Sequence, residues 1–164
     1  LGAIEGIIER TRLPYSVTTT RNDSMNTPGS LYHLLSLKNK LVYQGKINTR
    51  DLLPRRLTAS VNTTGDPAVI RIYWNPVLTN YLRWTTQSDF NASLYATQDS
   101  TGLFTLAAQA VPPVAAFHVS DNSTIDVDLS EIGLHVPPNS FITAVISSTS
   151  NITAASASFI YVED

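Results

Sequence analysis

The chain lacks cysteine altogether, and it is also poor in glycine, methionine and charge. The absence of cysteine excludes thiol catalysis, thiolate metal sites and disulfide bonds together. Only seven glycines are available for loops that approach a ligand closely, and no Walker, dinucleotide-binding or Gly-x-Ser-x-Gly pattern occurs. Stability must therefore come from packing or from oligomerisation, and nothing supports nucleotide or nucleophile chemistry.

Charge and hydrophobicity argue against two classes of protein, those that bind nucleic acid and those that insert into a membrane. Charged residues make up 15% of the chain and leave a formal net charge of -2, and the longest basic clusters are Arg55-Arg56 and the pair Lys38 and Lys40. We therefore expect no nucleic-acid partner. No apolar run approaches the roughly 20 residues of a membrane span, so we expect no membrane insertion. Because the chain begins with Leu1, we expect it to be processed or to be a fragment of a longer protein.

The first residues, LGAIEGIIER, predict a short helical or extended arm. Ile4, Ile7 and Ile8 recur at helical spacing until Pro14 forbids continuation. So short a helix is marginal alone, so its apolar stripe needs a partner, either its own domain or the same stripe on neighbouring subunits. The breaker-rich run RNDSMNTPGS then predicts a surface loop, so we divide the chain into an arm and loop over 1–30 and a domain over 31–164.

Strand patterns follow one another through the domain. In STIDVDLS, Ile125, Val127 and Leu129 alternate with Asp126 and Asp128, which indicates a half-buried antiparallel strand. FITAVIS and VIRIYW are apolar at nearly every position, as expected of strands covered on both faces. Tight turns recur at short spacing without a long helical segment between them, which favours an all-β antiparallel β-sandwich or jelly roll. We expect strands at 31–37, 40–44, 57–62, 68–74, 82–85, 93–97, 104–111, 115–120, 124–129, 141–147 and 157–162.

Titratable residues form no convincing catalytic or metal-binding pattern. His33, His118 and His135 lie far apart in the sequence and none belongs to a short-spaced ligand pair, so we expect no metal and no cofactor. His118 is expected to point outward from its strand, and His135, beside a Pro-Pro turn, to be solvated. Paired carboxylates on one strand face can support glycoside hydrolysis, or gather oxygens around Ca²⁺, but they more often keep that face soluble. The residues considered for hydrolysis are Asp126, Asp128 and Glu131. Those considered for Ca²⁺, whose spacing does not match an EF-hand loop, are Asp121, Asn122, Ser123, Asp126 and Asp128.

Aromatic side chains cluster in IYWNPVLTNYLRW, and two interpretations compete. The cluster can be a stacking platform for a sugar or an anchor in an interface, with Tyr81, Arg83 and Trp84 as the ligand-binding residues. Alternatively, at least one tryptophan fills the core of the sandwich and the other aromatic residues cover its rim.

Beyond its separate turns, the region 31–164 resembles structural proteins of tailed bacteriophages. The shared pattern has a "SLKNK...YNGK.N" start, a proline-marked strand, a turn before "PV.I.L", a "KNPTLT" segment and an aromatic closing strand followed by Glu-Asp. Tyr73-Trp74 departs from the pattern, in which a lysine is common before the Asn-Pro turn. The matching elements are Ser36 to Lys40, Tyr43 to Lys46 with Asn48, Pro54, Asp66 to Val69, Asn75 to Thr79 and the final PPNSFITAVISSTSNITAASASFIYVED.

This resemblance implies a non-enzymatic virion component, either a tail-fibre or appendage domain or a capsid-decorating protein. Its expected partners are other virion proteins and further copies of itself, with a trimer favoured, and Ile4, Ile7 and Ile8 are the expected assembly contacts. One alternative is a carbohydrate-binding module of an adhesin or fibre tip that binds a host-surface glycan through Tyr81, Arg83 and Trp84. Another is a small glycan-degrading enzyme that uses Asp126, Asp128 or Glu131.

Overall fold

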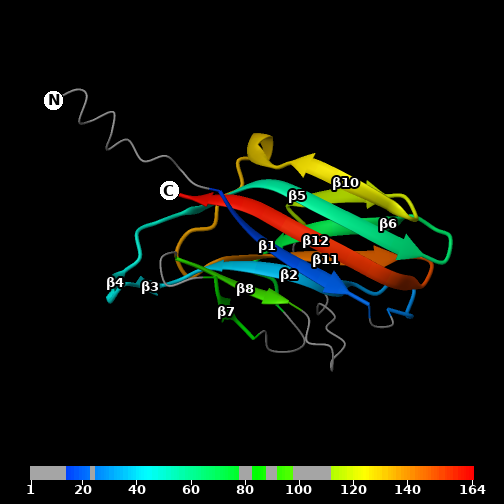
Figure 1. Ribbon diagram of the computed structural model, residues 1–164, viewed down its shortest axis with the longest axis horizontal. Coiled ribbons are helices and arrows are strands. Elements are labelled where there is room, and N and C mark those ends of the chain that lie inside the picture. The colour runs from blue at the N-terminus through cyan, green and yellow to red at the C-terminus, as the bar shows by residue number, and fades with distance from the viewer. Residues whose placement is uncertain (1–13, 23–24, 78–82, 88–91, 98–111) are drawn as a thin grey trace.

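The computed structural model describes residues 14–22, 25–77, 83–87, 92–97 and 112–164. Within these residues the protein is an all-β sandwich of two antiparallel sheets (Figure 1), which confirms the predicted fold class. A single 3-10 turn, Ser130–Ile132, is the one helical element in this part of the chain. Among the described residues no helix has the length and apolar character needed to cross a membrane.

Two main sheets and a small hairpin contain all the described strands. The four-stranded sheet has the order β1 (Tyr15–Arg21), β12 (Ile152–Glu163), β5 (Leu52–Thr63) and β10 (Ser123–Asp128). The six-stranded sheet has the order β7 (Thr85–Thr86), β8 (Ser93–Thr97), β2 (Tyr32–Asn39), β11 (Phe141–Ser148), β6 (Ala68–Trp74) and β9 (Ala115–Val119). The hairpin pairs β3 (Val42–Tyr43) with β4 (Lys46–Ile47).

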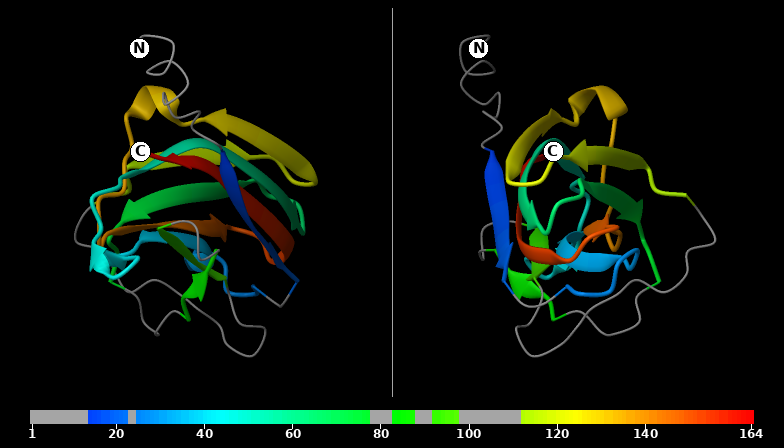
Figure 2. Two further views of the ribbon diagram at one scale, coloured as in Figure 1. Left: turned by 60° about the vertical axis from the view of Figure 1, so that its left-hand side comes forward. Right: turned by 90° about the vertical axis from the view of Figure 1, so that its right-hand side faces the viewer.

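The connectivity of eight of these strands is that of a jelly roll. The chain moves from β1 to β2 in the opposite sheet, then from β5 to β6, from β9 to β10 and from β11 to β12. In each sheet a late strand fills the gap between two early ones, because β12 lies between β1 and β5 while β11 lies between β2 and β6. The two sheets face one another in Figure 2, and β7 and β8 extend one edge.

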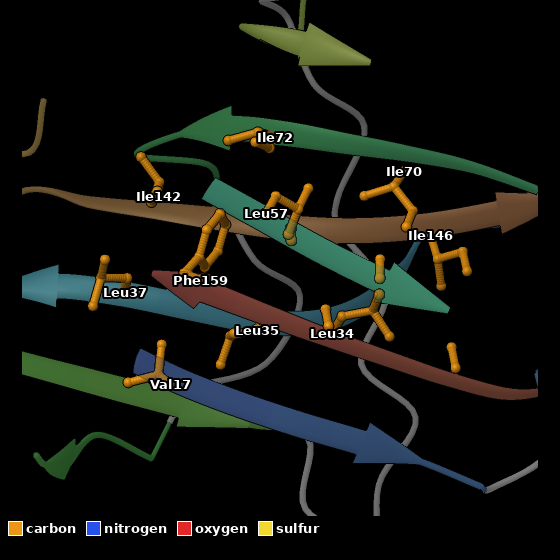
Figure 3. Packing of buried hydrophobic residues seen from close by; sticks show 14 of the residues in the cluster. Val17, Leu34, Leu35, Leu37, Leu57, Ile70, Ile72, Ile142, Ile146 and Phe159 are labelled. Carbon is orange, nitrogen blue, oxygen red and sulfur yellow. The ribbon is translucent and has the colours of Figure 1, made fainter. Parts of the chain in front are cut away.

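Apolar side chains from both sheets meet in the space between them (Figure 3). Val17, Leu57 and Phe159 come from the four-stranded sheet, and Leu37 and Ile72 come from the six-stranded sheet. The alternation along β5 and β12 places every second side chain in this core because successive residues of a strand point to opposite faces.

Strand β10 shows the predicted alternation. Ile125 and Val127 are half-buried and pack against the core, whereas Asp126 and Asp128 are exposed. The expectation of a half-buried strand with one wet face is therefore confirmed.

Three sequence-based expectations need comment. Residues 15–21 fall in the predicted arm and loop, yet they form β1 and pair along their whole length with β12. The sandwich therefore begins before residue 31, because the β-prone run VTTT alternates buried and exposed positions in register with a long partner strand. The predicted strand at 104–111 and the arm residues Ile4, Ile7 and Ile8 lie outside the described residues.

The interpretation that a tryptophan fills the core is wrong. Trp74 is 43% exposed and Trp84 is half-buried. Trp74 is the last residue of β6, beyond the aliphatic core, so its ring lies at the end of the sandwich.

Candidate functional site: the outer face of the six-stranded sheet

Side chains on the outer face of the six-stranded sheet form rows, because paired residues on neighbouring strands point to the same side. Ile70 and Ile72 of β6 point into the core (Figure 3), so Val69, Arg71 and Tyr73 point outward. Three rows follow from the strand register: His118 with Val69 and Ser147; Arg71 with Val145 and His33; and Tyr73 with Thr143 and Ser36.

A β-bulge in β2 brings two residues of this face together. His33 and Ser36 are three residues apart and would face opposite sides of a regular strand. The pairing with β11 shifts between Ala144–Leu35 and Val145–His33, so Leu34 is an extra residue in β2. Leu34 and Leu35 then both pack in the core, while His33 and Ser36 both point outward.

The bulge creates a buried polar trio. The imidazole Nε2 of His33 lies 2.8 Å from the Ser36 hydroxyl oxygen, which lies 2.7 Å from the Thr143 hydroxyl oxygen. All three residues are 0% exposed. The Arg21 guanidinium donates a hydrogen bond to the His33 carbonyl oxygen at 2.9 Å. Burial, assisted by the Arg21 charge, lowers the pKa of His33 from 6.5 to about 3, so the imidazole is neutral at physiological pH.

This trio has the Ser–His distance of an activated nucleophile but not its accessibility. A nucleophile must meet its substrate, whereas Ser36 is fully enclosed and bonds Thr143 as well as His33. The arrangement is better suited to fixing β2 against β11 through a buried polar network in the sheet. Sequence reasoning missed it because only the bulge places His33 and Ser36 on one face.

The same face carries a hollow, which we call the Arg71 hollow. Its walls come from β6, β9, β11 and the neighbouring turns, and it holds Arg71, Tyr73, His118, Ser147 and Thr149. The Arg71 Nη1 donates to the Ser147 hydroxyl at 2.7 Å. His118 is exposed, as its strand phase predicts.

The structure places the predicted sugar-binding residues at one edge of the sandwich. Arg83 is exposed and Trp84 is half-buried, while Tyr81 lies outside the described residues. The Trp84 ring packs edge-on against Phe141 with centroids 5.5 Å apart. The Lys38 ammonium lies 5.3 Å from the Trp84 ring centroid. These contacts use part of the ring as packing surface, which makes Trp84 a cover for the edge as much as a platform.

The carboxylates considered for hydrolysis are all exposed to solvent. Asp126 is exposed and bonds the Arg56 side chain at 3.0 Å. Asp128 accepts hydrogen bonds from the hydroxyl and the backbone N–H of Ser130, which lower the pKa of its carboxyl below the usual range. A lowered pKa suits a solvated carboxylate and not a general acid. Glu131 is also exposed, in the 3-10 turn.

Metal-binding groups are equally dispersed in the part of the chain that the structure describes. No three His, Asp or Glu side chains there gather closely enough to hold a metal ion. Asp121, one of the residues considered for Ca²⁺, accepts a hydrogen bond from the Thr63 backbone N–H at 2.8 Å and so anchors the turn after β5. His135 is exposed, as predicted.

Large exposed hydrophobic residues gather at one end of the sandwich, which we call the hairpin end. This end holds β3 and β4, the connections that leave β6 and enter β9, and the connection from β10 to β11 (Figure 1). Every large exposed hydrophobic residue among the described positions belongs to it: Leu41, Val42, Ile47, Trp74, Val77, Val114 and Ile132. The described turns at the opposite end, at 25–31, 64–67, 120–122 and 149–151, carry none.

Two asparagines anchor the hairpin to the body of the sandwich. Asn39 is 0% exposed and donates to the carbonyl oxygens of Arg50 and Val136 at 2.6 and 2.9 Å. Asn48 donates to the Asn39 side-chain oxygen at 2.6 Å and to the Lys40 carbonyl oxygen at 2.7 Å. The chain enters and leaves the hairpin beside this buried pair. The hydrogen bonds of the two asparagines therefore hold the base of the hairpin that carries the exposed apolar residues.

Comparison with known proteins assigns no family. No protein-family model matches the chain, and no curated protein matches it significantly.

Proposed function

We propose that this chain is a non-catalytic structural component of a virus particle, acting through subunit assembly and surface attachment. The fold supports the proposal, because jelly rolls are a common architecture of viral capsid and lectin domains. Fold alone does not assign function, so the main support for the proposal comes from the surfaces of the protein. The buried polar trio and the dispersed carboxylates favour a scaffold over an enzyme.

The unequal distribution of apolar residues between the two ends carries the proposal. Monomeric proteins rarely expose many large hydrophobic residues in one region unless that region meets a partner. Among the described residues they are confined to the hairpin end, with Ile47 78% exposed on a hairpin held by Asn39 and Asn48. We propose that this end meets further copies of the chain or other virion proteins, in a homo-oligomer for which we favour a trimer.

The experiment is the solution mass of Ile47→Asp by light scattering across a concentration series. Burial of an isoleucine side chain contributes roughly 2 kcal/mol, so its loss weakens association by about 30-fold. The fold should survive, because Ile47 is mostly exposed in a single chain. Thr64→Asp, an exposed position at the opposite end, is the matched control and should associate like the parent. A parent chain that is monomeric at all concentrations would refute the proposal.

The arm offers a second assembly contact within the same proposal. Ile7→Asp is expected to weaken association while the sandwich stays folded, because one charge disrupts the stripe of Ile4, Ile7 and Ile8. Glu9→Gln is the control on the polar side of that stripe. Unchanged subunit association in Ile7→Asp would remove the arm from the assembly mechanism and leave the hairpin end to be judged by its own variant.

A second candidate function is carbohydrate binding at the sandwich edge. The half-buried Trp84 beside the exposed Arg83 favours it, since a partly covered aromatic ring next to a cation is suited to one face of a sugar. A glycan array tests it. Binding that disappears in Trp84→Ala would support a module of the adhesin or fibre-tip type, and a purely architectural domain should bind nothing there.

A further inference from the structure

The Arg71 hollow has the size and mixed lining of a small-ligand site. It encloses about 650 Å³, within the range of pockets that hold small molecules. Leu31, Val69 and Tyr73 supply apolar surface, while Ser147 and Thr149 supply hydroxyl groups. The site lies on the outer face of the six-stranded sheet, formed by a different set of residues from the assembly surface of the hairpin end.

Arg71 brings a positive charge to this hollow without a carboxylate to balance it among the described residues. Arg50 is paired with Glu163, and Arg56 is paired with Asp126. The half-buried guanidinium instead donates one hydrogen bond to the neutral Ser147 hydroxyl. A guanidinium presents five donors in a planar fork that matches a carboxylate, so most of its donors remain for a ligand.

The surrounding groups favour a sugar acid over a simple anion. The Ser147 hydroxyl accepts from Arg71 and keeps its own proton to donate. The Thr149 hydroxyl donates to Asp66 at 2.8 Å and keeps its lone pairs to accept. Leu31 and Val69, both half-buried, offer apolar surface for the C–H side of a pyranose ring. His118, on the neighbouring strand in the row of Val69, adds a further hydrogen-bonding group at the exposed side.

From this arrangement we propose that the Arg71 hollow binds a carboxylate-bearing sugar, either free or as the terminal residue of an acidic glycan. Arg71 holds the carboxylate, and Ser147 and Thr149 bond the ring hydroxyls. The proposal does not depend on assembly and does not involve Tyr81, Arg83 or Trp84.

The test is ligand-observed saturation-transfer NMR of the full chain with D-glucuronate, D-glucose and acetate. Glucuronate and glucose differ at one carbon, so the pair isolates the carboxylate, while acetate isolates the sugar ring. An oligosaccharide ending in glucuronate, compared with the free sugar, separates the two sources of the ligand. Arg71→Gln and Arg71→Lys are the site variants; Arg55→Gln, which changes an exposed arginine of the other sheet, is the control.

We expect saturable binding of glucuronate, at least tenfold weaker binding of both glucose and acetate, and a loss of about tenfold or more in affinity for Arg71→Gln. Arg71→Lys should keep the charge but recover only part of the affinity, because the fork is lost. Arg55→Gln should bind like the parent. Equal affinity for glucose, equal affinity for acetate, absence of glucuronate binding, or an equal loss of affinity in Arg55→Gln would each overturn the proposal.

Discussion

The buried imidazole of His33 makes the stability of this protein depend on pH in a way that can be measured. Its pKa is about 3 in the folded chain, against 6.5 for an ordinary histidine. Above pH 6.5 the imidazole is neutral in both folded and unfolded chains and contributes no pH dependence. As the pH falls below 6.5, the His33 imidazole binds a proton in the unfolded chain but stays neutral in the folded chain. The free energy of unfolding therefore declines until about pH 3.

The size of the effect follows from the uptake of one proton. Each pH unit in this window lowers the free energy of unfolding by about 1.4 kcal/mol. At pH 4.5, two units below the ordinary value, the loss is about 3 kcal/mol, a large part of the stability of an ordinary domain. Asp66 and Asp128, whose pKa values are lowered by hydrogen bonds, also contribute to acid sensitivity at still lower pH.

The assay is urea unfolding of the parent and of His33→Gln from pH 7 to pH 4.5. The carboxylates are common to both proteins, so the difference between their slopes isolates His33. Below pH 6.5, the free energy of unfolding should fall less steeply with decreasing pH in the variant than in the parent. The expected difference between the two slopes is about 1.4 kcal/mol per pH unit. NMR titration of the His33 ring protons supplies a readout that needs no variant. A ring that titrates near pH 6.5, or parallel slopes in the two proteins, would refute the reasoning.

Two further predictions concern the hairpin. Asn39→Ala removes three hydrogen bonds, two of them buried, and leaves the carbonyl oxygen of Val136 without the Asn39 donor. The free energy of unfolding should therefore fall by about 3 kcal/mol. A loss below about 1 kcal/mol in urea unfolding would contradict the anchoring role of Asn39. Gln44 and Gly45 both have positive φ, 53° and 74°, in the two-residue turn between β3 and β4, so Gln44→Asn should raise stability by about 0.5 kcal/mol because asparagine tolerates this conformation better. Thermal unfolding measures it, with Gly45→Ala, expected to destabilise, as the opposing control.

Much of the strand content could be predicted because burial imposes alternation. The expected bounds of β6 and β8 match the structure, and β11 differs by one residue. The first half of β12 was not predicted, since Ala154 to Ser156 are small residues with weak strand preference. Ala155 and Ser156 pair with both β1 and β5, and Ala154 pairs with β5; such pairing is a tertiary effect that a local pattern does not contain.

The candidate site was harder to predict for a related reason. A reading of strand phase places His33 and Ser36 on opposite faces, and only the pairing with β11 shows that Leu34 is an extra residue. The Arg71 hollow likewise depends on register, because residues from three strands and their turns line it. The prediction of a tryptophan in the core failed for a different reason. The size and hydrophobicity of the side chain suggested burial, but Trp74 is exposed because it lies at the end of β6.

The position of β12 in its sheet has a consequence for the chain as it leaves the ribosome. Strands β1 and β5 have no neighbour between them until residues 152–163 have been synthesised, and β2 and β6 wait in the same way for β11. Because synthesis proceeds at roughly 5–20 residues per second, these strands keep open edges for several seconds. The Ser- and Thr-rich β1 and the Pro54-Arg55-Arg56 segment of β5 are poor templates for wrong pairing. The nascent chain thus carries its own protection against aggregation in β1 and β5, the two strands that β12 later joins.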